Sequence, residues 1–200
     1  QGKTKRYVFT SSQSVYPPGS GLKETGFDPF AYRFPQAVSQ SEDYGEAKRQ
    51  AEATFFQKAA FPVTAVRFPI VLGEDDYTER LKFYVSGIEH GKNLYFPNLS
   101  ARLSFVQSLD AAKFLLWLSL HELTGPVHCC APEPIALRDL VQTIALSVGR
   151  EAKVTTSPTP EGSPFGLESD WYMDTSRLKD AGFHPVPIPL WLPGLVQKLR

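Results

Sequence analysis

The sequence has little cysteine, no excess of charge of either sign and no long hydrophobic run. Its two cysteines, Cys129 and Cys130, are adjacent. Neighbouring strand residues point to opposite faces, so we expect no disulfide between them. We predict two buried thiols in a reducing compartment, the cytoplasm. His128 beside them does not complete a ligand cluster, so we predict no metal site.

Charge and hydropathy argue against two further classes of partner. Lysine and arginine number 21 and aspartate and glutamate also number 21, so the net charge is zero. A balanced chain gives no indication of nucleic-acid binding. The longest strongly apolar run, 114–120, is far too short to span a bilayer. We therefore expect neither nucleic acid nor a membrane as a partner; the small-molecule substrate expected for the chain follows from the family resemblance described below.

The chain does contain enough hydrophobic residues, 42% of 200, to bury a core of one domain or slightly more. Residues 6–11 form an apolar run that is typical of a buried parallel strand. Residues 43–60 predict a helix, and the β-branched segment 63–68, which ends at Pro69, predicts a second buried strand. Strand, long loop, helix and strand in this order indicate a βαβ crossover in a parallel sheet.

Shorter elements are expected beyond Gly73. The predicted helices are 77–90, 109–121 and 135–148, and the predicted strands are 93–96, 102–106, 127–130 and 153–156. The Pro-, Gly- and Ser-rich segments 17–40 and 157–169 predict loops. The tail from 185 is expected to end in a half-turn or short helix. The acidic cluster 74–76 is expected to complement the dipole of helix 77–90.

Tyr44 and Lys48 are the candidate catalytic pair. They are four residues apart at the start of a predicted helix, so their side chains lie on one face. A nearby ammonium favours the phenolate, and such a tyrosine can exchange a proton near neutral pH. Ser12 ends the first strand, where its hydroxyl could share a substrate oxygen with the phenol. The alternative for Tyr44 and Lys48 is an ordinary i,i+4 pair at an exposed helix N-terminus. The alternative for Ser12 is a capping residue at the end of a strand.

Longer motifs surround these residues. They are Ser11-Ser12-Gln13-Ser14-Val15-Tyr16, Tyr44-Gly45-Glu46-Ala47-Lys48 with Glu52, and Arg67 with Gly73. They resemble Ser-Ser-x-x-Val-Tyr, Tyr-Gly-x-x-Lys-x-x-x-Glu and Arg-x-x-x-x-x-Gly of the extended short-chain dehydrogenase/reductases, the NAD-dependent epimerase/dehydratase family. Segments 105–112, 125–140 and 174–178 are similar to later motifs of that family, so the resemblance spans the chain in colinear order.

The resemblance implies an α/β fold. It would comprise the C-terminal part of a doubly wound parallel-sheet (Rossmann-like) domain and a small α+β substrate-binding lobe. Residues 1–73 would belong to the Rossmann-like domain, to which 105–131 would return. Residues 74–104 and 132–200 would form the lobe.

The resemblance also implies roles for the site residues. Tyr44 would be the general acid/base, Lys48 would bind the nicotinamide ribose, and Ser12 would donate a hydrogen bond to the reacting oxygen. Phe68 and Pro69 would line the nicotinamide, so that they complete an NAD or NADP site with Tyr44 and Lys48. The implied chemistry is hydride transfer between NAD(P) and an alcohol carbon.

The implied substrate is a sugar, a sugar nucleotide or a related hydroxyl or carbonyl compound. Ser12, Gln13 and Arg102 are the expected substrate-binding residues. Ile70 stands where sugar-nucleotide members usually carry Asn, and Ser108 where they carry Asp. Epimerase, dehydratase and reductase activities therefore stay open.

One family feature has no counterpart in the sequence. None of its fourteen glycines forms G-x-G-x-x-G or G-x-x-G-x-x-G, the turn that holds a dinucleotide pyrophosphate. We expect the chain to be the C-terminal two-thirds of a longer protein and to bind NAD(P) poorly by itself. Strand 6–11 would then expose an edge that pairs with the missing part or with a second chain in a homodimer. The alternatives are a non-catalytic NAD(P)- or metabolite-sensing regulatory protein on the same scaffold and an inactive truncated product.

Overall fold

The structure, a computed structural model, describes residues 4–35 and 43–200. Its strands are β1 (Tyr7–Ser12), β2 (Gly19–Leu22), β3 (Val63–Phe68), β4 (Ile70–Leu72), β5 (Asn93–Tyr95), β6 (Arg102–Leu103), β7 (Phe105–Gln107), β8 (Gly125–His128), β9 (Ile135–Ala136), β10 (Lys153–Thr155) and β11 (Trp171–Met173). Its helices are α1 (Tyr44–Lys58), α2 (Arg80–Glu89), α3 (Ser108–Leu120), α4 (Leu137–Val148), α5 (Ser176–Asp180) and α6 (Ile188–Lys198), with 3-10 turns η1 (Gln13–Val15) and η2 (Glu24–Gly26).

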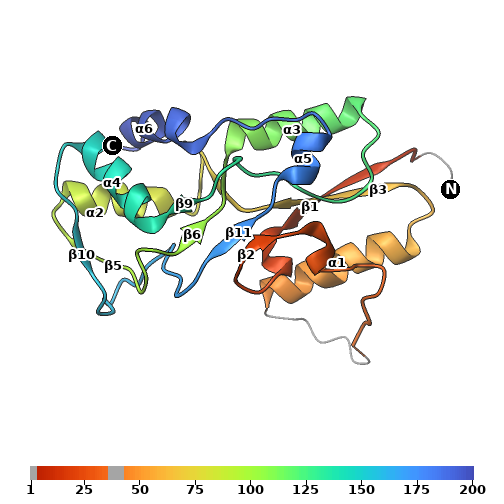
Figure 1. Cartoon of the computed structure of the whole chain (residues 1–200), viewed down its shortest axis with the longest axis horizontal. Helices are drawn as coiled ribbons and strands as arrows, with labels where there is room; N and C mark the ends of the chain where they lie inside the picture. The colour runs from red at the N-terminus through yellow and green to blue at the C-terminus, as the bar shows by residue number, and fades with distance from the viewer. Residues whose placement is uncertain (1–3, 36–42) are drawn as a thin grey trace.

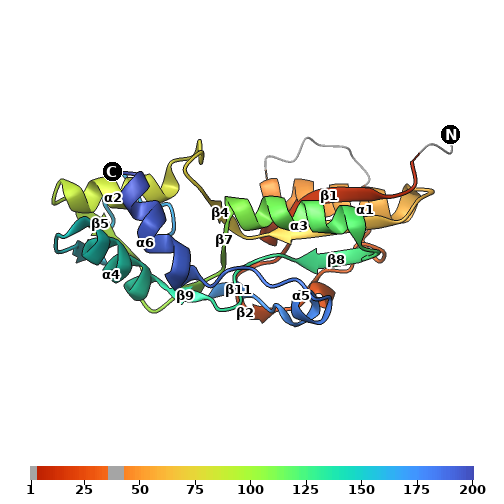
Figure 2. The same cartoon turned by 90° about the horizontal axis from the view of Figure 1, so that it is seen from above.

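A parallel three-stranded sheet in the order β1-β3-β8 forms one half of the molecule. Strand β3 lies in the middle and all six of its residues are buried. Helices α1 and α3 cover opposite faces of this sheet (Figures 1 and 2). Val66 and Phe68 pack in the cluster that includes α3, whereas Arg67 bonds to Glu52 of α1. Successive side chains of β3 point to opposite faces of the sheet, so the strand packs against both α1 and α3.

The other half of the molecule is built around helices α2, α4 and α6, whose apolar faces share one core (Figure 1). This core includes buried Tyr84, Leu140 and Leu192. Two small sheets accompany it, a mixed sheet in the order β2-β11-β6-β9 and the pair β10-β5, while β4 pairs with β7. The mixed sheet joins segments from both ends of the chain, because β2 and β11 are parallel neighbours.

The structure confirms the predicted parallel α/β arrangement and the strand at 63–68. The burial predicted for Cys129 and Cys130 is also confirmed, since both thiols are free and buried. No helix in the described part of the chain is long and apolar enough to cross a membrane.

Three local predictions were wrong. The predicted loop 17–40 contains β2 and η2, because β2 gains its hydrogen bonds from the distant strand β11; residues 36–40 of that prediction lie outside the described residues. The predicted strand 102–106 is two strands, β6 and β7, which join different partners. The predicted short terminal helix is the eleven-residue α6, which accommodates a proline in its first turn and also Pro193.

The assignment of the acidic cluster 74–76 to a helix dipole was wrong as well. Helix α2 begins at Arg80, and its first turn contains no acidic residue. Glu79 precedes it with φ of 51°, in the left-handed region that L-residues rarely adopt. The helix thus begins three residues later than predicted, without an acidic residue in its first turn.

Candidate active site

Tyr44 is the first residue of α1. The side chain of Asp43 caps this helix by accepting from the backbone N–H groups of Gly45 and Glu46, at 2.8 and 3.3 Å. An N-cap of this kind satisfies donors that the helix itself leaves unpaired. The cap fixes the first turn, while the Tyr44 side chain remains 59% exposed and available to a ligand.

Gly45 allows α1 to approach the strand that carries Ser12. A Cβ atom at this position would lie 2.4 Å from the backbone oxygen of Ser14. Real Cβ atoms do not come so close, so any other residue would push α1 away from η1. The glycine after Tyr44 therefore sets the spacing between the tyrosine and the serine turn.

Lys48 lies one helical turn after Tyr44 and bridges α1 to β1. Its Nζ donates to the backbone oxygen of Thr10 at 2.9 Å. The ammonium also lies 5.5 Å from the centre of the Tyr44 ring and 5.2 Å from that of Phe9. Both distances are in the range of cation–π attraction. The positive charge is thus held beside the tyrosine by a backbone anchor.

Ser12 ends β1 and caps the following turn η1. Its Oγ accepts from the backbone N–H of Ser14 and its hydroxyl donates to Ser14 Oγ, both at 3.1 Å. The capping role considered from the sequence is therefore observed. Ser12 also lines the same cavity as Tyr44, so capping and access to a ligand occur together.

These residues open onto a cavity of about 550 Å³ at the junction of the two halves. Ser12, Gln13, Tyr44 and Pro69 are the expected site residues among its lining. The other lining residues come from η1, β4, β6, β11, the segment before α2, the first residue of α2 and nearby loops: Ser14, Ile70, Val71, Asp76, Tyr77, Thr78, Arg80, Leu103, Ser104, Pro164 and Trp171. The cavity therefore combines segments that span almost the whole sequence.

Three expected site residues lie outside this lining. Lys48 contacts β1 behind Tyr44. Phe68 is 5% exposed and packs in the core between β3 and α3. Arg102 pairs with Asp170 at 2.6 Å and covers the ring of Tyr172. The hydrogen bond from Arg102 lowers the pKa of Asp170 below its usual value.

Sequence reasoning missed several lining residues, among them Asp76, Arg80, Ser104 and Trp171. Trp171 lies three residues before the family-like segment Asp174-Thr175-Ser176. It is not itself part of any recognised motif. Arg80 looked like an ordinary surface residue of a helix. Only the placement of distant segments around one cavity identifies these residues.

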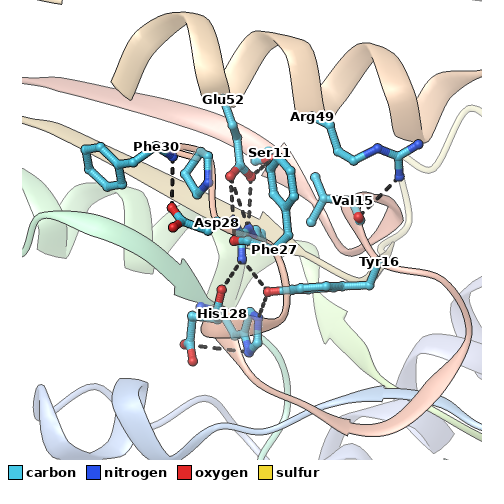
Figure 3. A network of polar contacts seen from close by, with 12 residues as sticks. Ser11, Val15, Tyr16, Phe27, Asp28, Phe30, Arg49, Glu52 and His128 are labelled. Carbon is cyan, nitrogen blue, oxygen red and sulfur yellow. Dashed lines mark hydrogen bonds and ion pairs between the residues drawn. The ribbon is translucent and has the colours of Figure 1, made fainter. Parts of the chain in front are cut away.

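A buried ion pair fixes α1 against the neighbouring strands. Arg67 and Glu52 are fully buried, and NH2 of Arg67 lies 2.6 Å from Oε2 of Glu52. Ser11, the residue before Ser12, donates a short hydrogen bond to the same carboxylate. Figure 3 shows this network beneath α1. Glu52 thus ties the helix of Tyr44 to the strands that flank the site.

All five N–H donors of Arg67 have acceptors. Nε and one NH2 proton serve Glu52, and the second NH2 proton reaches the Phe27 backbone oxygen at 3.0 Å. The two NH1 protons reach the Glu24 backbone oxygen at 2.7 Å and, in a short bond, the Tyr16 hydroxyl. A buried guanidinium is stable only when it is fully paired in this way. The loop 13–27 therefore wraps around one cation.

His128 completes this network in its neutral form. Its Nδ1 donates to the backbone oxygen of Asp174 at 2.8 Å. Its Nε2 accepts from the Tyr16 hydroxyl at 2.7 Å (Figure 3). Burial lowers the pKa of His128, and the charge of Arg67 adds to this effect. The carboxylate of Glu24, 3.6 Å away, opposes but does not outweigh the burial.

Comparison with known protein families gives one match. The sequence model of the NAD dependent epimerase/dehydratase family matches residues 1–128. No curated protein matches the chain.

Solved structures show the same fold. UDP-glucose 4-epimerase of Thermus thermophilus, in complex with NAD, superposes with a TM-score of 0.67 at 16% identity, over 98% of this chain and 64% of its own. A dTDP-glucose 4,6-dehydratase of Streptomyces venezuelae, with NAD bound, gives 0.70 at 16% identity, over 96% of this chain and 59% of its own. UDP-N-acetylglucosamine 4-epimerase of Methanobrevibacter ruminantium gives 0.66 at 15% identity, over 98% and 61%. The chain thus spans about 60% of the length of these structures.

Proposed function

Since the chain belongs to the NAD dependent epimerase/dehydratase family, we propose that it provides the proton-transfer and substrate-binding part of an NAD(P)-dependent enzyme that acts on a sugar nucleotide. The observation that carries the proposal is that Ser12 and Tyr44 line one cavity while Lys48 lies beside the Tyr44 ring. These are the three residue types that the proposed chemistry needs. Epimerases and dehydratases begin with hydride transfer from the substrate alcohol carbon to NAD(P), and a reductase uses the same transfer in the opposite direction.

In the proposed mechanism, Tyr44 takes the proton from a substrate hydroxyl as that group becomes a carbonyl, and returns it in the reverse step. Ser12 donates a hydrogen bond to the same oxygen after its hydroxyl turns away from Ser14. Lys48, anchored on Thr10, keeps a positive charge beside the phenol and stabilises its anionic form. NAD(P), when bound, supplies the hydride acceptor.

The described residues fit the nicotinamide end of such a cofactor. Tyr44 and Lys48 present a hydroxyl and an ammonium from one helix face, which suits the hydroxyls of a ribose. Pro69 lines the cavity next to them, whereas Phe68 supports the site from the core. The sequence contains no glycine-rich turn for the pyrophosphate. We therefore propose that Tyr44, Lys48 and Pro69 hold only the nicotinamide riboside part.

The cavity also suits the phosphorylated end of a sugar nucleotide. Arg80 lines it and has no carboxylate partner within the described ranges, so its guanidinium is available for phosphate oxygens. Tyr77 on the same rim is 94% exposed and offers an aromatic face to a base. The sugar-nucleotide names of the similar structures agree with this substrate class.

The proposed division of labour follows the two halves of the molecule. We propose that residues 1–73 and 105–131 belong to the cofactor-binding domain, and that 74–104 and 132–200 form the substrate-binding lobe. The separate cores around α3 and around α2, α4 and α6 support two units, with Leu178 packed in the first core and Leu72 and Phe105 in the second where the units join. Strand β1 is an edge of its sheet within the described residues, and we propose that a further strand pairs with it in the functional assembly.

The decisive test is turnover by protein expressed from its complete coding sequence. UDP-glucose, UDP-N-acetylglucosamine and dTDP-glucose would be incubated with NAD or NADP, and products would be identified by NMR. The Tyr44→Phe variant is expected to lose about 10²- to 10⁴-fold in kcat, the usual contribution of general acid/base catalysis, and to retain most of its cofactor binding through Lys48 and Pro69. The matched control is Tyr95→Phe in β5, which lies outside the cavity lining and is expected to keep full activity.

Other outcomes separate the alternatives. Cofactor binding without turnover of any of the three substrates would favour a sensor on the same scaffold. Equal activity of wild type and Tyr44→Phe would contradict the proposed role of the tyrosine. Loss of binding in Tyr44→Phe, with an unchanged unfolding transition, would assign Tyr44 to cofactor binding instead of proton transfer.

A further inference from the structure

The turn η1 has Ser12 at its N-terminal end and Tyr16 at its C-terminal end. Ser12 is the N-cap of this turn and Tyr16 is its C-cap. Ser12 lines the cavity, whereas Tyr16 is only 3% exposed. The Tyr16 ring packs in a small core with Val15, Cys130 and Met173. One short turn therefore joins a site residue to a residue that is held inside the protein.

The proposed mechanism weakens one support of this turn. Ser12 Oγ accepts from the backbone N–H of Ser14 and its hydroxyl donates to Ser14 Oγ, both at 3.1 Å. A Ser12 side chain that turns toward a substrate oxygen gives up these bonds. A 3-10 turn of three residues has few hydrogen bonds of its own. The position of η1 in that state therefore depends on contacts at its other end.

The Tyr16 hydroxyl makes two hydrogen bonds to buried partners at that end. It accepts a short bond from NH1 of Arg67 and donates to Nε2 of His128 at 2.7 Å (Figure 3). Arg67 belongs to β3 and His128 to β8, so the hydroxyl ties η1 to two strands of the parallel sheet. Burial raises the pKa of Tyr16 above its usual value, so the phenol keeps the proton that it shares with His128.

A second side chain holds the middle of the turn. NH1 of Arg49 in α1 donates to the backbone oxygen of Val15 at 3.2 Å (Figure 3). The Arg49 side chain is 25% exposed, so water competes for this bond. Hydrogen bonds are stronger where water is excluded, so we expect the buried contacts of Tyr16 to hold η1 more firmly than Arg49 does.

We propose that Tyr16 is a positioning residue that holds η1 and thereby keeps the Ser12 hydroxyl within reach of the reacting oxygen beside Tyr44. Tyr16 is not among the described residues that line the cavity, so it acts through Ser12. This inference rests on the proposed function, because it requires Ser12 to act on the substrate. A misplacement of about 1 Å can cost about 10²-fold in rate, so the loss of this support is expected to lower turnover.

A double-mutant cycle tests this role in the protein expressed from its complete coding sequence. Tyr16→Phe keeps the packed ring and removes only the hydroxyl. It is expected to lower kcat about 10- to 100-fold. KM is expected to stay nearly unchanged, because Ser12 would act on the oxygen mainly as the carbonyl forms. In a Ser12→Ala background, Tyr16→Phe is expected to change kcat by less than about twofold, because no hydroxyl remains to be positioned.

Thr64→Val is the matched control. It also removes a buried hydroxyl, which donates to the backbone oxygen of Leu123 and lies outside the cavity lining. This variant is expected to keep the wild-type kcat. Thermal unfolding would show that each variant is folded at the assay temperature. If Tyr16→Phe does not fold, Arg49→Gln takes its place in the cycle, with a smaller loss of kcat that again requires the Ser12 hydroxyl.

The outcomes distinguish this inference from the proposed function. Equal losses of kcat with and without the Ser12 hydroxyl would overturn the inference, because they indicate a general disturbance of the fold. A wild-type kcat in the Tyr16→Phe variant, or a change confined to KM, would overturn it as well. All these results leave the proposed function in place, since the wild type is active in each. No turnover by the wild type with UDP-glucose, UDP-N-acetylglucosamine or dTDP-glucose would contradict the proposed function and this inference together.

Discussion

Glu52 Oε2 lies 2.6 Å from the NH2 group of Arg67, and neither side chain has any exposed surface. This ion pair is two helical turns from Tyr44 and one from Lys48 on the same helix. The Glu52 carboxylate also accepts a hydrogen bond from the Ser11 hydroxyl. A single carboxylate therefore connects α1 and β1, which carry the candidate catalytic residues, to the central strand β3. Removing one partner would leave a buried charge unpaired, whereas removing both would not.

Glu52→Leu is expected to destabilise the fold by about 3–5 kcal/mol, because the buried guanidinium of Arg67 loses its counter-charge. The double variant Glu52→Leu/Arg67→Met is expected to be more stable than Glu52→Leu alone, since neither charge remains. Urea unfolding would measure both. Arg102→Gln, which breaks an exposed pair, is the control and is expected to have a far smaller effect. A double variant less stable than the single one would contradict this account.

Gly45→Ala is expected to destabilise the protein by about 1–3 kcal/mol, the usual cost of overpacking, although alanine is the better helix former. The added Cβ would meet the Ser14 backbone oxygen at 2.4 Å and displace Tyr44 from Ser12. Gly194→Ala in α6 is the matched control, because nothing lies within 4 Å of its added Cβ. It is expected to gain up to about 1 kcal/mol from helix propensity. Thermal unfolding of both variants checks the difference, and equal effects would refute the steric explanation.

His128 is expected to make stability depend on pH. Its pKa is lowered in the folded state by burial, so below a pH of about 6.5 the unfolded chain binds the proton more readily. The histidine therefore contributes stability above that pH, which is lost as the pH falls. The slope can reach about 1.4 kcal/mol per pH unit. Unfolding free energies between pH 7.5 and 5.5 would measure it.

The controls for this pH dependence are two glutamine variants. His128→Gln is expected to be less stable at pH 7.5 and to show a flatter profile, because the titrating group is gone. His184→Gln, at an exposed position, is expected to keep the wild-type profile. A steep profile that persists in His128→Gln would contradict the assignment to His128.

Arg80→Gln is expected to weaken binding of UDP-glucose about tenfold at low salt, because an unpaired guanidinium on the cavity is lost. Added salt should reduce the difference between variant and wild type. Lys82→Gln is the matched control, because Lys82 is two residues away and already paired with Glu79 at 2.7 Å. Equal losses in the two variants would indicate a general charge effect and no phosphate contact.

Local geometry explains which parts of the site were predictable. Tyr44 and Lys48 were recognisable because i,i+4 spacing on a helix brings two side chains together without help from the rest of the chain. Ser12 was recognisable because it ends an apolar strand. Strand β3 was predictable to the residue, since its β-branched run is bounded by two prolines, Pro62 and Pro69.

Other parts depended on contacts between distant segments. Strand β2 has a weak sequence pattern with two glycines and forms because β11, about 150 residues later, supplies its hydrogen bonds. Arg102 stays a predicted substrate-binding residue, and only the fold shows that Asp170 pairs with its guanidinium. Phe68 stays a predicted cofactor-lining residue, and only the fold shows that it packs in the core with α3.

The sequence by itself determined the βαβ order, the helix face shared by Tyr44 and Lys48, and the family, because each depends on short-range spacing along the chain. Only the tertiary structure decided which side chains close the cavity. Gln13 and Trp171 are 158 positions apart, and they line one cavity only because the fold brings η1 beside β11. Arg67 likewise becomes the centre of a buried network only when acceptors from separate segments reach it. Such contacts follow from packing, which no local pattern records.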